Sequence, residues 1–101
     1  MRYQRSASFV ADYERLAPRE RELFKAAVRA LNEAYDRRSG WPSAWPRTLR
    51  LKRVRGHATI WEMTWSFAGP AGRATFEIID LEGEPCLRWR RIGGHSIFDQ
   101  P

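Results

Sequence analysis

The spacing of apolar residues changes once along the chain, and this change limits the folds that the chain can adopt. Over residues 19–38, apolar side chains recur every three or four positions, the period of a helix with one buried face. After Pro46 the period falls to two, which is the period of a strand in a sheet. Helices followed by a run of strands, rather than alternating with them, predict an α+β fold.

Two helices and a short first strand are expected in the first part of the chain. Residues 3–9 should form a strand or an extended lead-in, and residues 10–16 a short helix. Pro18 fits the first turn of a longer helix over residues 19–38, because its missing N–H would have no partner there. Gly40 should end this longer helix.

Strands joined by short turns are expected in the second part of the chain. They cover residues 47–55, 59–67, 73–79 and 86–92. Trp61, Met63 and Trp65 alternate with polar residues and should face a core. Short turns join antiparallel neighbours. We therefore expect a single domain, residues 1–101, with an antiparallel sheet behind the two helices.

The composition indicates a folded protein with an anionic partner. Aromatic residues make up 13% of the chain, a content that disordered segments lack. The chain has 18 Lys and Arg residues against 12 Asp and Glu, which gives a net charge of +6 at pH 7. Most of the basic residues are arginines, whose planar forks match phosphate groups and stack on bases. A nucleic-acid or ribosomal partner is favoured, although a basic surface that only confers solubility would have the same totals.

Several kinds of site and location are disfavoured by what the chain lacks. Cys86 is the only cysteine, so no disulfide can form within the chain. A zinc site is disfavoured because the other soft ligands are only His57 and His95. No signal peptide is visible, and no apolar run approaches the roughly 20 residues of a membrane span. We expect a cytoplasmic protein with no metal, no cofactor and no membrane partner.

The first candidate binding segment is the basic run over residues 47–55, RTLRLKRVR, which contains no acid. On a regular strand Arg50 and Lys52 point to the same side, and a row of cations on a sheet could follow a phosphate backbone. The alternative is an edge strand whose charges prevent aggregation. The candidate RNA-binding residues of this run are Arg50, Lys52, Arg53 and Arg55.

The second candidate is the C-terminal segment RWRRIGGHSIF. Arg88 and Arg90 should share one face of the last strand and could bind RNA, while Arg91 should follow Trp89 on the other face. The Gly-Gly pair then lets the backbone turn and bring His95 near the strand end. An imidazole there could move protons during RNA cleavage, with arginines stabilising the charge on the phosphate. A lone histidine can equally be structural.

Arg73, which follows Gly72 at the start of a strand, is the third candidate, although it could be a solvated turn residue. Other reaction classes lack their motifs: there is no Gly-rich phosphate loop, no nucleophile elbow and no HExxH. A metal nuclease is also disfavoured because Asp80, Glu82 and Glu84 fall in a turn, and only Glu77 lies within a strand.

Five segments, taken in order, resemble the RelE/ParE superfamily of type II toxin–antitoxin toxins, and within it the HigB-like branch. They are FVADYERL, the helix that starts at Pro18, LRLKRVRG, IWEMTW followed by GRATFEI, and WRRIGGHSIF. The resemblance implies two N-terminal helices packed on a curved antiparallel sheet of about four to five strands. It also implies a cognate antitoxin and an endoribonuclease that cleaves mRNA on the ribosome.

The resemblance also implies roles for individual residues. Arg73 matches the mid-sheet arginine that binds phosphate in the family, and Arg50 and Lys52 match its basic strand residues. Arg91 and His95 match the basic and proton-transferring positions at the end of the last strand. Many relatives instead place a lysine or tyrosine near the C-terminus.

The first hypothesis is therefore a metal-independent mRNA endoribonuclease that inhibits translation. His95 would transfer protons, and Arg73 and Arg91 would hold the scissile phosphate during attack by the 2′-hydroxyl. The alternatives are a non-catalytic toxin of the ParE kind that binds DNA gyrase, and a plain RNA-binding module. The nuclease hypothesis requires cations from separate strands to meet around one phosphate-sized space beside the imidazole.

Overall fold

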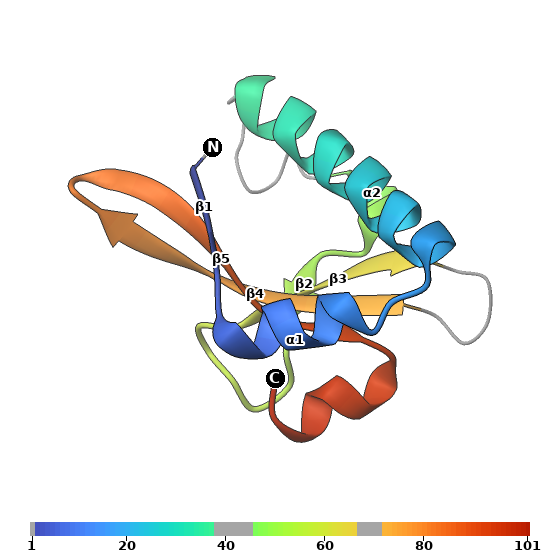
Figure 1. Cartoon of the computed structure of the whole chain (residues 1–101). Helices are drawn as coiled ribbons and strands as arrows, with labels where there is room; N and C mark the ends of the chain where they lie inside the picture. The colour runs from blue at the N-terminus through green and yellow to red at the C-terminus, as the bar shows by residue number, and fades with distance from the viewer. Residues whose placement is uncertain (1, 38–45, 67–71) are drawn as a thin grey trace.

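The computed structural model describes residues 2–37, 46–66 and 72–101, and within them the chain forms an α+β fold (Figure 1). Its elements, in chain order, are β1 (Arg2–Arg5), α1 (Ala7–Glu14), α2 (Pro18–Arg37), the 3₁₀ turn η1 (Arg47–Leu49), β2 (Lys52–Arg53), β3 (Trp61–Ser66), β4 (Gly72–Leu81), β5 (Glu84–Gly93) and the 3₁₀ turn η2 (His95–Asp99). The predicted helix stop at Gly40 lies outside the described residues.

The two helices begin where side chains satisfy their first backbone N–H groups. Ser6 caps α1, because its Oγ accepts a hydrogen bond of 3.0 Å from the backbone N–H of Phe9. This cap starts α1 at Ala7, three residues before the predicted start. At α2, Pro18 is the first residue, as predicted, and Glu20 Oε1 accepts from the backbone N–H of Ala17 at 2.8 Å.

The five strands form one mixed sheet with the order β1-β5-β4-β3-β2. Strands β2 to β5 pair with antiparallel neighbours, as predicted. The edge strand β1 instead pairs with β5 in parallel, so the prediction of a wholly antiparallel sheet was wrong. No hairpin joins these two strands: the helices and the rest of the sheet lie between them in the chain, so no tight turn constrains their direction.

The predicted strand over residues 47–55 was wrong for most of its length, since only Lys52 and Arg53 pair with β3. Before them the chain forms η1, and Arg50 has a positive φ of 48° that breaks the alternation of faces. Leu49 and Val54 are both buried, and their burial holds the segment in this irregular path.

A β-bulge in β5 changes which side chains of this strand face the core. Thr75 pairs with Arg91 and Phe76 pairs with Trp89, so Arg90 is an extra residue between the two pairs. Trp89 and Ile92 therefore both face the main core, and Arg91 lies on the opposite face. The expectation that Arg91 follows Trp89 was wrong, because it assumed an unbroken strand.

The main core lies between α2 and one face of the sheet (Figure 1). The opposite face, called the outer face below, is covered in part by the loop after β2 and by η2 at the C-terminal end (Figure 1). Val54, Ile60 and Ile97 are buried under this cover. Two hollows on the outer face are lined in part by residues of η2, and they contain most of the candidate residues.

Candidate active site

One hollow on the outer face, with a volume of about 380 Å³, collects candidate residues from different parts of the chain. We call it the basic hollow. Its described lining residues are Lys52, Val54, Arg55, Glu62, Arg73, His95 and Phe98. Four of these, Lys52, Arg55, Arg73 and His95, are candidates from the sequence, and they come from β2, the loop after it, β4 and η2.

Strand register explains why the charged residues of the basic hollow are neighbours. Lys52 is paired with Glu62 across β2 and β3, and Thr64 is paired with Arg73 across β3 and β4. Residues that are paired, or two positions apart, project from the same face of a sheet. Lys52, Glu62 and Arg73 therefore project from the outer face, while Met63 of β3 faces the main core.

Glu62 also lines the basic hollow, although it is not among the candidates chosen from the sequence. Its carboxylate is almost buried, with 11% of the side chain exposed, and Oε1 lies 3.7 Å from Lys52 Nζ. The sequence carried a signal for it, because Glu62 interrupts a strand of large apolar residues at a position facing away from the core. A carboxylate that is nearly buried beside cations is a group that can accept a proton.

Arg73 is half-buried, and its guanidinium is directed to no carboxylate among the described residues. The structure gives it one weak hydrogen bond, from Nη1 to the backbone O of Gly72 at 3.5 Å. Gly72 itself packs against the Trp65 ring so closely that a Cβ at this position would lie 2.5 Å from two ring atoms. The start of β4 is thus held by core packing, and the guanidinium remains available to an anion in the basic hollow.

His95 is the first residue of η2 and is exposed to solvent. Its ring meets the Phe98 ring edge-to-face, with centroids 5.1 Å apart. The imidazole is accessible at the wall of the basic hollow, and Phe98 supports it from the same turn.

Arg91 lies outside the basic hollow. Its Nε and Nη2 donate to the two carboxylate oxygens of Asp12 in α1, at 2.6 and 3.1 Å. This bidentate hydrogen bonding raises the pKa of Arg91 above its ordinary value, although burial acts in the opposite direction. The structure does not bring Arg91 together with Arg73 and His95.

Arg91 instead lines a second hollow of about 510 Å³, which we call the arginine hollow. It also contains Arg88 and Arg90, and His57 lies on its wall. Arg88 is exposed, while Arg90 forms an ion pair of 3.2 Å with Glu77. The remaining described lining residues are Ser6, Ile60, Asp99, Gln100 and Pro101.

The last two candidates from the basic run line neither hollow. Arg53 is exposed, and its guanidinium carbon lies 5.1 Å from the centroid of the Trp61 ring, in a cation–π contact. Arg50 is the exposed residue that ends η1.

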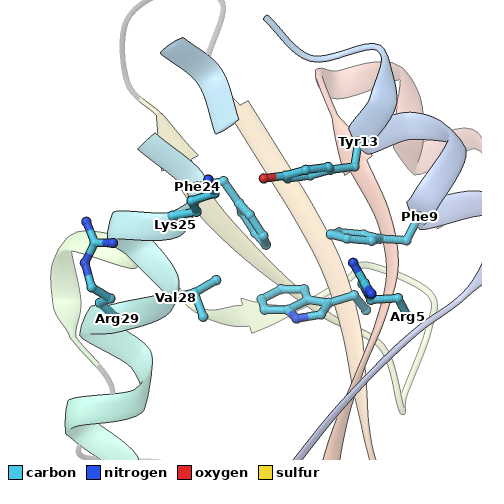
Figure 2. A pocket seen from close by; sticks show the side chains of 8 residues that line it. Arg5, Phe9, Tyr13, Phe24, Lys25, Val28 and Arg29 are labelled. Atoms are coloured by element: carbon cyan, nitrogen blue, oxygen red, sulfur yellow. The ribbon is translucent and has the colours of Figure 1, made fainter. Parts of the chain in front are cut away.

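A third hollow, of about 380 Å³, lies between the two helices and the sheet and is shown in Figure 2. Its walls are aromatic and aliphatic and its rim is basic; it is lined by Arg5, Phe9, Tyr13, Phe24, Lys25, Val28, Arg29 and Trp89. Its described lining residues include no histidine and no carboxylate. We therefore place the candidate chemistry in the basic hollow, where an imidazole and a carboxylate face the same space as cations.

Two further findings concern membrane spans and metal ligands. In the part of the chain that the structure describes, no helix is long and apolar enough to cross a membrane. Within the same residues, no three His, Cys, Asp or Glu side chains come together in a group that could hold a metal ion.

Comparison with known proteins establishes the fold. No protein-family model matches the sequence, and neither does any curated protein. Among solved structures, the chain is similar to the YoeB/ParE toxin from Agrobacterium tumefaciens, with a TM-score of 0.64 and 18% identity over 94% of this chain and 99% of that one. It is also similar to a chain of the intact E. coli RelBE toxin–antitoxin complex, with a TM-score of 0.58 and 13% identity over 92% of this chain and 94% of that one.

Proposed function

We propose that this protein is the toxin of a type II toxin–antitoxin system, of the HigB-like branch, and that it is an mRNA endoribonuclease that works on the ribosome without a metal. The observation that carries this proposal is the basic hollow. It combines an imidazole and a carboxylate, which can move protons, with the cations of Lys52, Arg55 and Arg73, which can hold a phosphate. The fold shared with the YoeB/ParE and RelE toxins supports the same assignment.

The proposed reaction is attack of the ribose 2′-hydroxyl on the adjacent phosphorus. The 2′-oxygen forms a bond to phosphorus and gives its proton to the carboxylate of Glu62. The bond from phosphorus to the 5′-oxygen of the next nucleotide breaks, and this oxygen takes a proton from the imidazolium of His95. The products are a 2′,3′-cyclic phosphate, which can open to a 3′-phosphate, and a free 5′-hydroxyl.

The cations have a separate task in this mechanism. Negative charge builds on the two non-bridging oxygens as the attacking oxygen approaches, and positioned cations stabilise it most in the transition state. Arg73 is suited to this task because its guanidinium has no carboxylate partner among the described residues. Lys52 Nζ lies 3.7 Å from Glu62 Oε1, so this cation faces the same space as the proposed proton acceptor.

The surfaces around the basic hollow suit the expected partners. The arginine hollow, with Arg88 and Arg90, lies on the same face, so it could hold the phosphates of mRNA or ribosomal RNA. A cognate antitoxin with acidic segments would be attracted to this face, and the similarity to a chain of a toxin–antitoxin complex supports such a partner. We expect the pair to act in the cytoplasm.

The test is inducible expression of the protein with mapping of mRNA 5′ ends. We expect growth arrest and new 5′ ends on translated messages with the wild type. His95→Ala and Glu62→Gln should abolish both effects, while His57→Ala, which changes the other histidine, should not. Full cleavage by His95→Ala would remove the imidazole from the mechanism.

Two alternatives make different predictions in the same experiment. A toxin of the ParE kind that binds DNA gyrase would arrest growth with DNA damage and intact mRNA. A plain RNA-binding module would leave growth unaffected, and substitution of His95 would be silent.

A further inference from the structure

The segment that carries His95 leaves β5 and then returns to it. After Gly93 and Gly94 the chain forms η2, and at its end Arg91 Nη1 donates to the backbone O of Gln100 at 3.2 Å. This hydrogen bond closes residues 91–100 into a loop, with His95 near its middle. We call this segment the His95 loop.

The guanidinium that closes the His95 loop is itself fixed by α1. Asp12 accepts from Arg91 Nε and Nη2, and its Oδ2 also accepts from the backbone N–H of Ile92 at 3.2 Å. Asp12 is 8% exposed, so its carboxylate has little freedom to turn elsewhere. Because a guanidinium is planar, its two bonds to Asp12 determine where Nη1 points, and that direction is toward Gln100.

Two further contacts hold the same segment to the sheet. Arg90 Nε donates to the backbone O of Pro101 at 3.1 Å, next to the closure at Gln100. Between the ends, Ile97 is 3% exposed, and an added Cβ on Gly93 would lie 3.2 Å from its Cγ2. By contrast, His95 is exposed, and the aromatic ring that its imidazole contacts among the described residues is that of Phe98. The position of its imidazole therefore depends on the backbone of the His95 loop and little on contacts of the His95 side chain.

We propose that Arg91 is a positioning residue for His95. Arg91 acts through the backbone of the His95 loop, and Asp12 holds Arg91 in place. This reassigns Arg91 from holding the scissile phosphate: three of its N–H groups are occupied by Asp12 and Gln100. The part of the inference that concerns cleavage rests on the proposed function. The part that concerns the position of the imidazole is independent of the proposed function.

The test variant is Arg91→Lys, which keeps the charge but has one ammonium in place of the planar fork. It can pair with Asp12 but cannot hold Asp12 and Gln100 in one fixed geometry. We expect the side-chain NMR signals of His95 to move, and the amide hydrogens of residues 95–100 to exchange about 10-fold faster or more. The kcat for RNA cleavage should fall about 10- to 100-fold, with KM changed much less, because misplacement of a reacting group affects the chemical step.

The matched control is Arg88→Lys, on the same strand and in the same hollow, where no described carboxylate forms an ion pair with the side chain. It should leave the His95 signals and amide exchange unchanged. Asp12→Asn, which keeps the shape of the Asp12 side chain and removes its charge, should reproduce the signal movement of Arg91→Lys. Thermal unfolding of each variant separates a local effect from loss of the fold.

The outcomes distinguish the inference from the proposed function. Unchanged His95 signals and unchanged exchange in a folded Arg91→Lys would overturn the inference. A raised KM with those signals unchanged would also overturn it, and would return Arg91 to RNA contact. If the wild type cleaves no RNA, the proposed function fails, and the NMR and exchange measurements still decide the role of Arg91.

Discussion

Binding of RNA at the basic hollow should depend on salt in a way that can be worked out from the structure. Among the residues that the structure describes, three permanent cations face this hollow: Lys52, Arg55 and Arg73. Lys52 is included because its side chain is 70% exposed and its 3.7 Å contact with Glu62 is longer than a hydrogen bond. Each cation that neutralises a phosphate of a single strand contributes about −0.7 to the slope of log affinity against log salt.

For the wild type the slope should be about −2, so affinity should fall about 20-fold between about 50 and about 200 mM salt. Arg73→Gln removes one cation, which should reduce the slope to about −1.4 and the fall to about 7-fold. Arg29→Gln is the matched control, since it removes the same charge from the exposed surface of α2, at the rim of the third hollow. Its slope should stay at the wild-type value.

The assay is fluorescence anisotropy with a short single-stranded RNA carrying 2′-O-methyl groups, so that no cleavage can occur. Affinity is measured at four or more salt concentrations for each protein. A wild-type slope near zero would show that phosphate contacts do not supply the affinity. Equal slopes for Arg73→Gln and the wild type would show that the basic hollow is not where the RNA binds.

The remaining predictions concern elements that hold the site. Gly72→Ala should destabilise the protein by about 1–3 kcal/mol, because its Cβ would overlap the Trp65 ring, which is 6% exposed. In urea unfolding, the double variant Gly72→Ala with Trp65→Phe should lose less free energy of unfolding than the two single variants lose together. Losses that simply add would refute the overlap. Ser6→Ala should cost about 1 kcal/mol, since it removes the cap on Phe9 N–H and a 2.7 Å hydrogen bond to the backbone O of Arg90. In calorimetry, this loss of stability should lower the Tm of Ser6→Ala by about 4–8 °C, and an unchanged Tm would contradict the capping role.

The periodicity of apolar residues was sufficient to predict the two helices and strands β3 to β5 in their order, but not η1, the short β2 or η2. Helical spacing predicted α2, Pro18 predicted its start, and alternation predicted β3, β4 and β5 with errors of a few residues at their ends. These patterns are local, because they follow from residues a few positions apart that share one face. The parallel pairing of β1 with β5 is not local, and the sequence pattern carries no signal for it.

The candidate site was also predicted only in part from the sequence. From the sequence alone, Lys52, Arg55, Arg73 and His95 were selected by residue type and by position in or beside a strand or turn, and the structure places all four around one hollow. Arg91 was selected on the same grounds but does not line this hollow, and its guanidinium is bound by Asp12 of α1 instead.

The sequence by itself therefore determined the two helices, the strands β3 to β5 and the basic charge of the chain, because these depend on composition and on spacing between near neighbours. Only the tertiary structure decided which charged groups face one another. The carboxylate of Glu62 joins the basic hollow through strand register, and Asp12 and Arg91, 79 positions apart, meet through the packing of α1 on β5. Such pairings depend on contacts between distant segments, which short-range patterns do not encode.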